Sequence, residues 1–379
     1  MNPVKALESH GQAVWLDFLA RGFIAKGDLK KLIDTDGVKG VTSNPSIFEK
    51  AIGSSDEYDA PIGKALESGD RSVADLFERL AVEDIQNAAD VLRPVYDALD
   101  GHDGFVSLEV SPYLGNDTKG TIAEARRLWK DVRRKNLMIK VPATAEGLPA
   151  IEQLIGEGIS VNITLLFSKE VYLEVAEAYL AGLEHLTAQG GDPQRVASVA
   201  SFFVSRIDVA VDKIIDERLR RTHDAEQRAT LSGLRGKVAI ANAKLAYQRY
   251  KRLFAGARWE RLRAKGARVQ RLLWASTGTK DPAASDVLYL TALQAPFTIN
   301  TMPEATLLDF ADHGVITDSL PADGGDAEEV LARFASARVD VPALASQLQK
   351  QGADAFVRSW NDLLECIAAR SHQLMAAAR

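Results

Sequence analysis

Short apolar, β-branched runs alternate along this chain with amphipathic helical stretches. Between the runs, apolar positions recur every three or four residues, as they do after Ser168, and Ser72 and Ser168 are suitable helix N-caps. Strands that alternate with helices form parallel βαβ units, either in an open doubly wound sheet or in a closed barrel. Eight strands favour the closed form, so we predict an α/β fold, a (β/α)8 TIM barrel with additional helices. The predicted strands are residues 14–18, 38–42, 105–110, 137–141, 159–165, 196–204, 269–275 and 298–300.

The chain beyond the eighth predicted strand has a helical pattern. A barrel of this kind takes about 250 residues, which leaves roughly 130 of the 379 for insertions and a tail. Residues 323–329 form an acidic, glycine-containing loop, and residues 353–378 predict a closing helix with Phe356, Trp360 and Leu363 on one side. No repeat or linker divides the chain. We therefore predict a single domain, residues 1–379, in which roughly residues 303–379 are a helical C-terminal extension packed on the barrel.

Composition and charge exclude several classes of protein. The chain is 46% hydrophobic and 26% charged, which is ordinary for a globular protein. Its net charge of −6 argues against a nucleic-acid partner, and no apolar run approaches the roughly 20 residues that span a bilayer. One cysteine, Cys366, cannot form an internal disulfide, and the six histidines are too scattered for a zinc site. With no signal peptide at its start, we expect a cytoplasmic protein without a metal or a membrane partner.

Residues 249–271 are strongly basic. They contain nine lysines and arginines against one acid, Glu260. This pattern is compatible with a nucleic-acid surface or with a solvated helical face. The acidity of the chain as a whole favours the solvated face.

Three ionisable residues lie near the carboxyl ends of three predicted strands: Asp17, Glu109 and Lys140. A buried charge is costly unless it is paired, so each residue alone is explained by a surface position or a structural ion pair. All three together have a common explanation, because the catalytic groups of a barrel converge at the carboxyl ends of its strands. Asn162 and Thr164 are two apart on the fifth predicted strand, so they lie on one face of that strand.

Lys140 is the most informative of these residues. It lies in the apolar run 137–142, and burial of a lysine favours its neutral, nucleophilic amine. A neutral amine facing a pocket is what Schiff-base chemistry with a ketone or aldehyde requires. Such chemistry also requires groups like the carboxylates of Asp17 and Glu109. Dehydration of the carbinolamine needs a proton shuttle, and carbon–carbon cleavage needs a base that takes the proton of the hydroxyl group.

Several segments taken together resemble the transaldolase family, of its longer bacterial type. They occur in that family's order, and the resemblance extends from about residue 13 to residue 310. The segments at 40–48 and 138–144 are specific in combination. The matching segments are 15–17 (WLD), 40–48 (GVTSNPSIF), 107–110 (SLEV), 138–144 (MIKVPAT), 162–168 (NITLLFS) and 201–207 (SFFVSRI).

The resemblance implies a (β/α)8 barrel and a cofactor-free Schiff-base mechanism. The family transfers a dihydroxyacetone unit from sedoheptulose 7-phosphate to glyceraldehyde 3-phosphate, giving erythrose 4-phosphate and fructose 6-phosphate, in the pentose phosphate pathway. Lys140 matches the family's Schiff-base lysine and Asp17 its acid/base for the C4 hydroxyl. Glu109 and Thr164 match the pair that holds the catalytic water.

The resemblance also implies a set of substrate-binding residues. Asn44 and Asn162 match residues that bind the dihydroxyacetone hydroxyls, and Ser201 and Phe203 match residues that line the same pocket. Arg206 matches a phosphate-binding arginine.

The chain departs from the family pattern in two places. Many relatives have Pro and Gly where this chain has Phe202 and Ser205, so the turn before Arg206 is expected to differ. Many also carry an arginine shortly after strand seven, where this chain offers Ser276 and Lys280. We predict Lys280 as the second phosphate contact, since a lysine is an adequate point-charge ligand for phosphate.

Two alternatives to a transaldolase stay open from the sequence. One is a fructose-6-phosphate-type aldolase that releases free dihydroxyacetone, and the other is a catalytically silent barrel that binds sugar phosphates. The joint presence of Asp17, Glu109, Lys140 and Thr164 argues against the silent barrel. The oligomeric state is not determined by the sequence.

Overall fold

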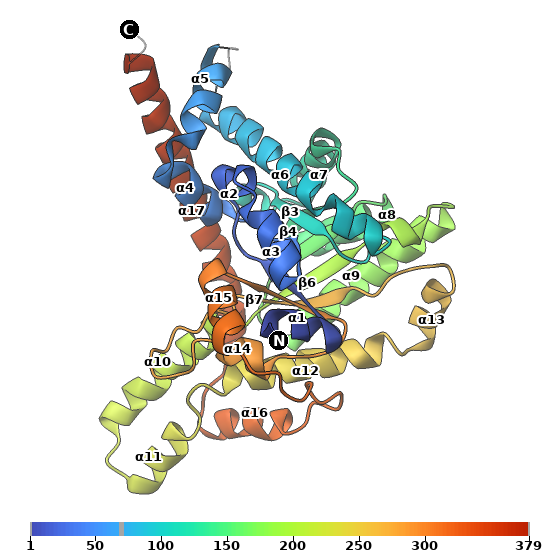
Figure 1. The fold of residues 1–379 in the computed structure, drawn as a ribbon. Coiled ribbons are helices and arrows are strands. Elements are labelled where there is room, and N and C mark those ends of the chain that lie inside the picture. The colour runs from blue at the N-terminus through green and yellow to red at the C-terminus, as the bar shows by residue number, and fades with distance from the viewer. Residues whose placement is uncertain (1, 68–71, 378–379) are drawn as a thin grey trace.

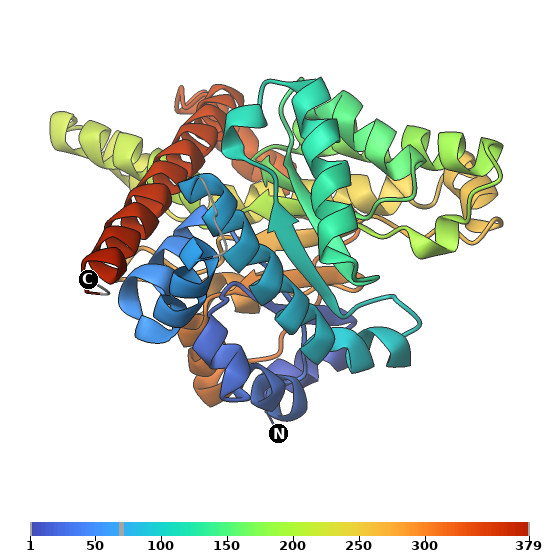
Figure 2. The same ribbon diagram turned by 90° about the horizontal axis from the view of Figure 1, so that it is seen from above.

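The computed structural model describes residues 2–67 and 72–377, and it contains a closed barrel of parallel strands in the order β1 to β8 (Figures 1 and 2). The predicted (β/α)8 barrel is confirmed. The strands are β1 (Gln12–Leu16), β2 (Val38–Val41), β3 (Phe105–Glu109), β4 (Leu137–Pro142), β5 (Val161–Leu166), β6 (Ser198–Phe203), β7 (Arg271–Ala275) and β8 (Thr298–Met302).

Helices follow the strands and cover the outside of the barrel (Figure 2). Nearly every strand residue is buried, because one face of each strand meets the helices and the other fills the interior of the barrel. The helices are α1 (Pro3–Ser9), α2 (Arg21–Ala25), α3 (Asp28–Asp36), α4 (Pro45–Ser54), α5 (Asp59–Glu67), α6 (Val73–Ala98), α7 (Thr118–Val132), α8 (Gly147–Gly156), α9 (Lys169–Ala188), α10 (Ser205–Arg221), α11 (Ala225–Ser232), α12 (Val238–Leu253), α13 (Ala257–Arg263), α14 (Leu288–Ala292), α15 (Glu304–His313), α16 (Ala327–Ser336) and α17 (Val341–Ala377), with short 3-10 turns at Asp56–Tyr58, Pro112–Leu114 and Pro193–Arg195.

Helix starts agree with the predicted caps. Ser72 accepts a hydrogen bond from the amide of Asp75 at the start of α6, and Ser168 accepts one from the amide of Val171 at the start of α9. These side chains satisfy backbone donors that the first helical turn leaves without partners.

Several predicted boundaries are wrong by a few residues. Strand β1 begins and ends two residues earlier than predicted, so Asp17 follows the strand, and β5, β6 and β7 each begin two residues later than predicted. The closing helix begins at Val341, twelve residues before the predicted start. The predicted loop at 323–329 ends in the first turn of α16. The extra helical residues include Pro342 and Gly352, two poor helix formers that weaken the helical pattern of residues 341–352.

Helix α17 lies across the carboxyl end of the barrel (Figure 2). It packs against α4, α5, α6 and α10 and reaches β5, and its Phe356, Leu363 and Ile367 belong to the same buried apolar cluster as the barrel strands. Within the described ranges, no helix has the length and apolar character needed to cross a membrane. That residues 1–379 form one domain stays a prediction.

Candidate active site

A cavity of about 140 Å³ lies at the carboxyl end of the barrel, where Asp17 and Lys140 face the same space. Residues from seven of the eight strands, all but β3, or from the segments that follow them meet there with one residue of α17. The lining residues are Asp17, Thr42, Asn44, Lys140, Thr164, Ser201, Phe203, Arg206, Ala275, Ser276, Gly278, Lys280, Thr301, Pro303 and Phe356. All of the predicted site residues are among them except Glu109 and Asn162, which lie buried beside lining residues.

Lys140 lies on β4 and is 5% exposed. Strand register sets it beside Glu109 of β3 on one side and Asn162 of β5 on the other. Its Nζ lies 3.3 Å from Glu109 Oε2, donates to the carbonyl of Ser43 at 3.1 Å and lies 5.5 Å from the ring centroid of Phe356. The amine is therefore held in one place by groups from three other elements.

Glu109 shares the buried environment of Lys140. Burial raises the pKa of the Glu109 carboxyl above its ordinary value, the Lys140 ammonium opposes that rise, and the Asp17 carboxylate adds to it. A carboxyl with a raised pKa can hold a proton as well as release one, which suits a group that exchanges protons beside an amine.

Asp17 lies at the turn after β1, and its backbone amide donates to the carbonyl of Met302. The hydroxyl of Thr42 donates to Asp17 Oδ1 at 2.6 Å and lies 2.8 Å from the hydroxyl of Thr301. These contacts fix the carboxylate while leaving Oδ2 without a hydrogen bond among residues 2–67 and 72–377. Asp17 can therefore accept a proton from a group in the cavity.

The polar floor of the cavity is a chain of hydrogen bonds between strands. Ser201 donates to Asn162 Oδ1 at 2.7 Å, and Asn162 Nδ2 donates to the hydroxyl of Ser107 at 2.9 Å. Asn162 is fully buried and both ends of its amide are engaged, so in this geometry it orients Ser201. Thr164 differs, since its buried hydroxyl makes no hydrogen bond to any described residue.

Asn44 is held by the helix that it begins. Its side chain accepts a hydrogen bond from the amide of Ile47 at the N-terminus of α4, and Pro45 occupies the first helical position. The Asn-Pro pair thus fixes the side chain that lines the cavity, and it leaves the amide NH2 of Asn44 free to donate.

Two cations, Arg206 and Lys280, also line the cavity. Arg206 is in the first turn of α10, with its guanidinium carbon 5.0 Å from the ring centroid of Phe203. Burial lowers the pKa of Arg206 and the Asp17 carboxylate opposes that shift, but an arginine stays charged at neutral pH. It forms no ion pair in the described part of the chain. Lys280 is exposed and also lines the cavity.

The turn before Arg206 is fixed by the end of β7. The amides of Val204 and Ser205 donate to the carbonyls of Ala275 and Ser276, and the hydroxyls of Ser205 and Ser276 lie 3.1 Å apart. Ser276 has a φ of 56°, a left-handed conformation that is uncommon outside glycine. The turn with Ser205 in the family's glycine position therefore still directs Arg206 to the cavity.

Comparisons with known proteins agree with this geometry. A model of the transaldolase/fructose-6-phosphate aldolase family matches residues 14–367. The chain belongs to this family. It is 50% identical to a transaldolase of Thermobifida fusca over 368 residues, covering 97% of this chain and 98% of that protein. It is also 44% identical over 375 residues to a transaldolase of Trichodesmium erythraeum, with 98% of each chain covered, and 46% identical over 369 residues to transaldolase 2 of Nostoc punctiforme, with 97% of each covered.

Some residues that line this cavity were not predicted from the sequence. Thr301 and Phe356 were not predicted, and Thr42 was noted only as part of a motif. Thr42 was detectable, because it precedes the Ser-Asn-Pro run at a strand end. Phe356 was not, because its apolar helical position predicts core packing and only the path of α17 brings its ring over Lys140.

Within the described residues, no group of three or more His, Cys, Asp or Glu side chains is placed to hold a metal ion. The polar groups that line the cavity of this protein include the amine of Lys140, the carboxylate of Asp17, several hydroxyls and the two cations Arg206 and Lys280. These groups suit proton transfer and anion binding.

Proposed function

We propose that this protein is a transaldolase that works through a Schiff base on Lys140. It would move a dihydroxyacetone unit from sedoheptulose 7-phosphate to glyceraldehyde 3-phosphate, giving erythrose 4-phosphate and fructose 6-phosphate, in the non-oxidative pentose phosphate pathway. Full-length relatives named transaldolase support the activity. The observation that carries the proposal is the buried Lys140 amine, 3.3 Å from Glu109 and in one cavity with Asp17 and Arg206.

The first step is attack of the neutral Lys140 amine on the C2 carbonyl of the ketose. A proton passes from the amine to Glu109, whose raised pKa suits it to accept and later return that proton. Addition gives a carbinolamine, and loss of its hydroxyl as water gives the iminium. The hydroxyl of Thr164, which has no partner among the described residues, is available to hold that water beside Glu109.

Cleavage follows at the bond between C3 and C4. Asp17 accepts the proton of the C4 hydroxyl, the C3–C4 bond breaks, and its electron pair flows into the iminium. The aldose phosphate leaves, and the three-carbon unit stays on Lys140 as an enamine. The hydrogen bond from Thr42 holds Asp17 in position for this step, and the reverse sequence on a new aldehyde completes the transfer.

The phosphates of donor and acceptor would bind at Arg206 and Lys280. A guanidinium without a carboxylate partner is a strong phosphate ligand, while the exposed Lys280 adds a point charge. Fixing the phosphate fixes the distance of the acceptor's aldehyde from the enamine. Asn44 and Ser201 would bind the hydroxyls of the dihydroxyacetone unit, with Asn162 holding Ser201 and Phe203 forming the apolar wall.

Mass spectrometry after borohydride reduction tests the proposal. Incubation with fructose 6-phosphate and borohydride should add one reduced three- or six-carbon unit to the peptide that contains Lys140. The Lys140→Met variant should add none and lose at least about 10³-fold in turnover. The matched control is Lys39→Met on β2, whose amine pairs with Glu8 and which should keep the adduct. An unmodified Lys140 peptide in active enzyme would refute the mechanism.

The family name also includes fructose 6-phosphate aldolases, so release of free dihydroxyacetone is the second candidate. The two activities differ in what happens to the enamine. A transaldolase should consume fructose 6-phosphate rapidly only when an aldose phosphate acceptor is present. Equal rates with and without acceptor, with free dihydroxyacetone as product, would assign the aldolase activity instead.

A further inference from the structure

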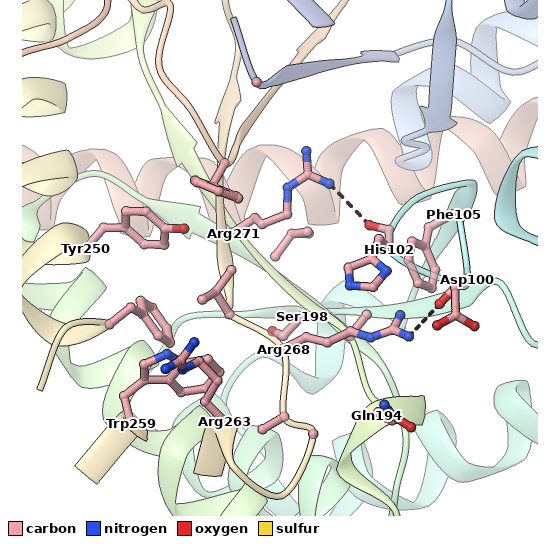
Figure 3. A pocket seen from close by; sticks show the side chains of 18 of the residues that line it. Asp100, His102, Phe105, Gln194, Ser198, Tyr250, Trp259, Arg263, Arg268 and Arg271 are labelled. Carbon is pink, nitrogen blue, oxygen red and sulfur yellow. Dashed lines mark hydrogen bonds between the residues drawn. The ribbon is translucent and has the colours of Figure 1, made fainter. Parts of the chain in front are cut away.

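A second, larger cavity lies at the other end of the barrel. It measures about 770 Å³, within the range of small-molecule sites, and is lined by the amino ends of strands and by α12, α13 and their loops (Figure 3). Phe105, Ser198 and Arg271, the residues at or near the starts of β3, β6 and β7, form its floor. None of the candidate catalytic residues lines it, so the reaction proposed above does not account for this cavity.

One wall of this amino-end cavity is a continuous row of aromatic rings. Tyr250 and Phe254 have ring centroids 5.2 Å apart, and Phe254 and Trp259 meet edge to face at 4.9 Å. Trp259 and Tyr250 are only 2% and 3% exposed, so their environments are set by the fold. Phe254, which is half-buried, therefore supplies the accessible apolar face of this wall, backed by the two covered rings, for a ligand with a planar ring.

Polar atoms on this wall have no partners. The hydroxyl of Tyr250 makes no hydrogen bond to any described residue, and neither does the indole N–H of Trp259. Figure 3 shows the Tyr250 hydroxyl directed toward the interior of the cavity, on the side facing Arg271. Neither atom is fully enclosed, so a ligand that accepts hydrogen bonds can reach both donors.

A histidine lies across the cavity from the aromatic wall (Figure 3). His102 Nδ1 lies 2.9 Å from the carbonyl of Leu99. Because a carbonyl can only accept, Nδ1 carries the hydrogen, and Nε2 of the neutral ring is an acceptor. It has no hydrogen-bond partner within residues 2–67 and 72–377. An exocyclic amino group on a planar ring is a matching donor.

The basic segment 249–271 supplies the charge of this cavity. Lys251, Arg263, Arg268 and Arg271 line it, against the carboxylates of Asp100 and Glu260. Two of these cations are neutralised, Arg263 by Glu260 and Arg271 by Asp103.

The other two cations keep their charge. Arg268 donates to the backbone carbonyls of Asp100 and Gly101, which are neutral, and Lys251 has no ion-pair partner in the described ranges. The cavity is therefore net positive in a chain of net charge −6, so it favours an anion.

Phe297 adds an exposed ring at the rim. It is 62% exposed and has a φ of 60°, a conformation that is a strained outlier for a bulky side chain. Phe297 directly precedes β8, and its backbone amide donates a hydrogen bond to the carbonyl of Gly11. Strain that is held in place at a cavity rim is typical of ligand-contacting residues.

We propose that this amino-end cavity is a second ligand site, for a phosphate-bearing molecule with a flat aromatic ring, of the nucleotide class. The ring lies against Phe254, with the exposed Phe297 at the rim of the cavity, and the phosphate lies toward Arg268 and Lys251. The aromatic row favours a planar ring over a sugar phosphate, which has no flat face to stack. The site is independent of the reaction proposed for the carboxyl end.

Titration calorimetry with ADP tests the proposal on the full-length protein. ADP should bind. Adenosine, which lacks the phosphates, and pyrophosphate, which lacks the aromatic ring, should each bind at least about tenfold more weakly. Phe297→Ala and Lys251→Gln should each weaken ADP binding at least about threefold and leave the basal transfer rate unchanged. Leu308→Ala and Lys31→Gln, matched changes at exposed positions outside the cavity, should leave the affinity unchanged.

The binding must also be separated from the sugar-phosphate site. Arg206→Ala should leave ADP affinity unchanged, and saturating fructose 6-phosphate should not displace ADP. Three results would overturn the proposal: no ADP binding up to about 1 mM, equal binding by the Phe297 and Lys251 variants, or loss of binding in Arg206→Ala. Light scattering that shows a dimer dissociated by Phe297→Ala would assign this face to a second copy of the chain and also overturn it.

Discussion

The side chains of Lys140 and Glu109 form a nearly fully buried pair at the floor of the candidate active site. Such a pair costs desolvation energy that its attraction only partly offsets, so it is weak evidence for stability. A reacting amine explains the pair better, because the carboxyl can take and return the proton that the amine gains and loses. The raised pKa of Glu109 follows from the same burial.

Asp17→Ala should separate imine formation from cleavage. The variant should still give the borohydride adduct, because Asp17 acts after the iminium has formed. Aldehyde release should slow by about 10²- to 10⁴-fold, the usual range for one acid/base group. Single-turnover release of erythrose 4-phosphate or glyceraldehyde 3-phosphate measures the step. Thr42→Val, which removes the hydrogen bonds of the Thr42 hydroxyl to Asp17 and Thr301 but keeps the carboxylate, should show a smaller loss of the same kind. An Asp17 variant that forms no adduct would place its role earlier.

Arg206 and Lys280 should contribute unequally to phosphate binding. Arg206→Ala should raise KM for phosphorylated acceptors about tenfold or more, since a charge-assisted hydrogen bond is worth about 1.5–3 kcal/mol. Lys280→Ala should raise it about threefold, because an exposed charge is screened by solvent. Unphosphorylated glyceraldehyde is the control acceptor and should show little change with either variant. If both acceptors are affected equally, the residue does not bind the phosphate.

At the scale of elements, α17 determines how closed the site is. Gln349 donates to the carbonyls of Ala143 and Leu165, which follow or end strands β4 and β5. Gly352 fits closely there, since a Cβ would come within 2.8 Å of the Leu165 side chain. One turn further on, Phe356 covers the Lys140 amine. The helix is thus joined to the barrel at the point where water would otherwise reach the enamine.

Phe356→Ala should increase leakage to free dihydroxyacetone. Without the ring, water gains access to the enamine carbon, whose protonation leads to hydrolysis and release. We expect release without acceptor to rise about threefold or more relative to transfer, measured on fructose 6-phosphate. Asp354→Ala, at an exposed position of the same helix, should leave the ratio unchanged. An unchanged ratio in Phe356→Ala would show that the ring does not exclude water.

At the scale of the whole molecule, a buried carboxyl connects the helices on one side of the barrel. Asp208 on α10 accepts hydrogen bonds from the amide of Ala239 at 2.8 Å and from the hydroxyl of Tyr289 at 2.6 Å. Burial raises its pKa to about 6, and these hydrogen bonds oppose the rise. The folded protein therefore holds the Asp208 proton more tightly than the unfolded chain does.

This raised pKa predicts a pH dependence of stability. The contribution of the Asp208 proton is fully present below about pH 4 and is lost as the pH rises through about 6, by at most about 3 kcal/mol. Asp208→Asn keeps both contacts, since its amide can donate to the Tyr289 oxygen, and removes the titration. The variant should gain stability over the wild type between pH 4.5 and 7.5 in thermal unfolding. Asp318→Asn, at an exposed site, should show no such gain, and a constant difference across this range would contradict the assignment.

The predictions that held at each scale depended on local chemistry. The strand and helix types, the caps at Ser72 and Ser168, and most of the cavity lining followed from periodicity and from residues at strand ends. Strand boundaries failed by about two residues, because pairing with neighbouring strands rather than local propensity decides where a strand begins and ends. The start of α17 failed for the same reason, because contacts with α10 and β5 support residues 341–352, a stretch in which Pro342 and Gly352 disfavour a helix.

The sequence by itself determined the barrel and the chemistry available at the carboxyl ends of its strands. The alternation of apolar strand runs with amphipathic helical stretches and the polar residues at strand ends are local properties of the chain. Only the tertiary structure decided that Phe356 covers the amine and that Asn162 is engaged behind Ser201. It also decided that residues 249–271 line a cavity together with His102 and Phe297. These depend on which distant segments pack together, and burial and partner choice exist only once the chain has folded.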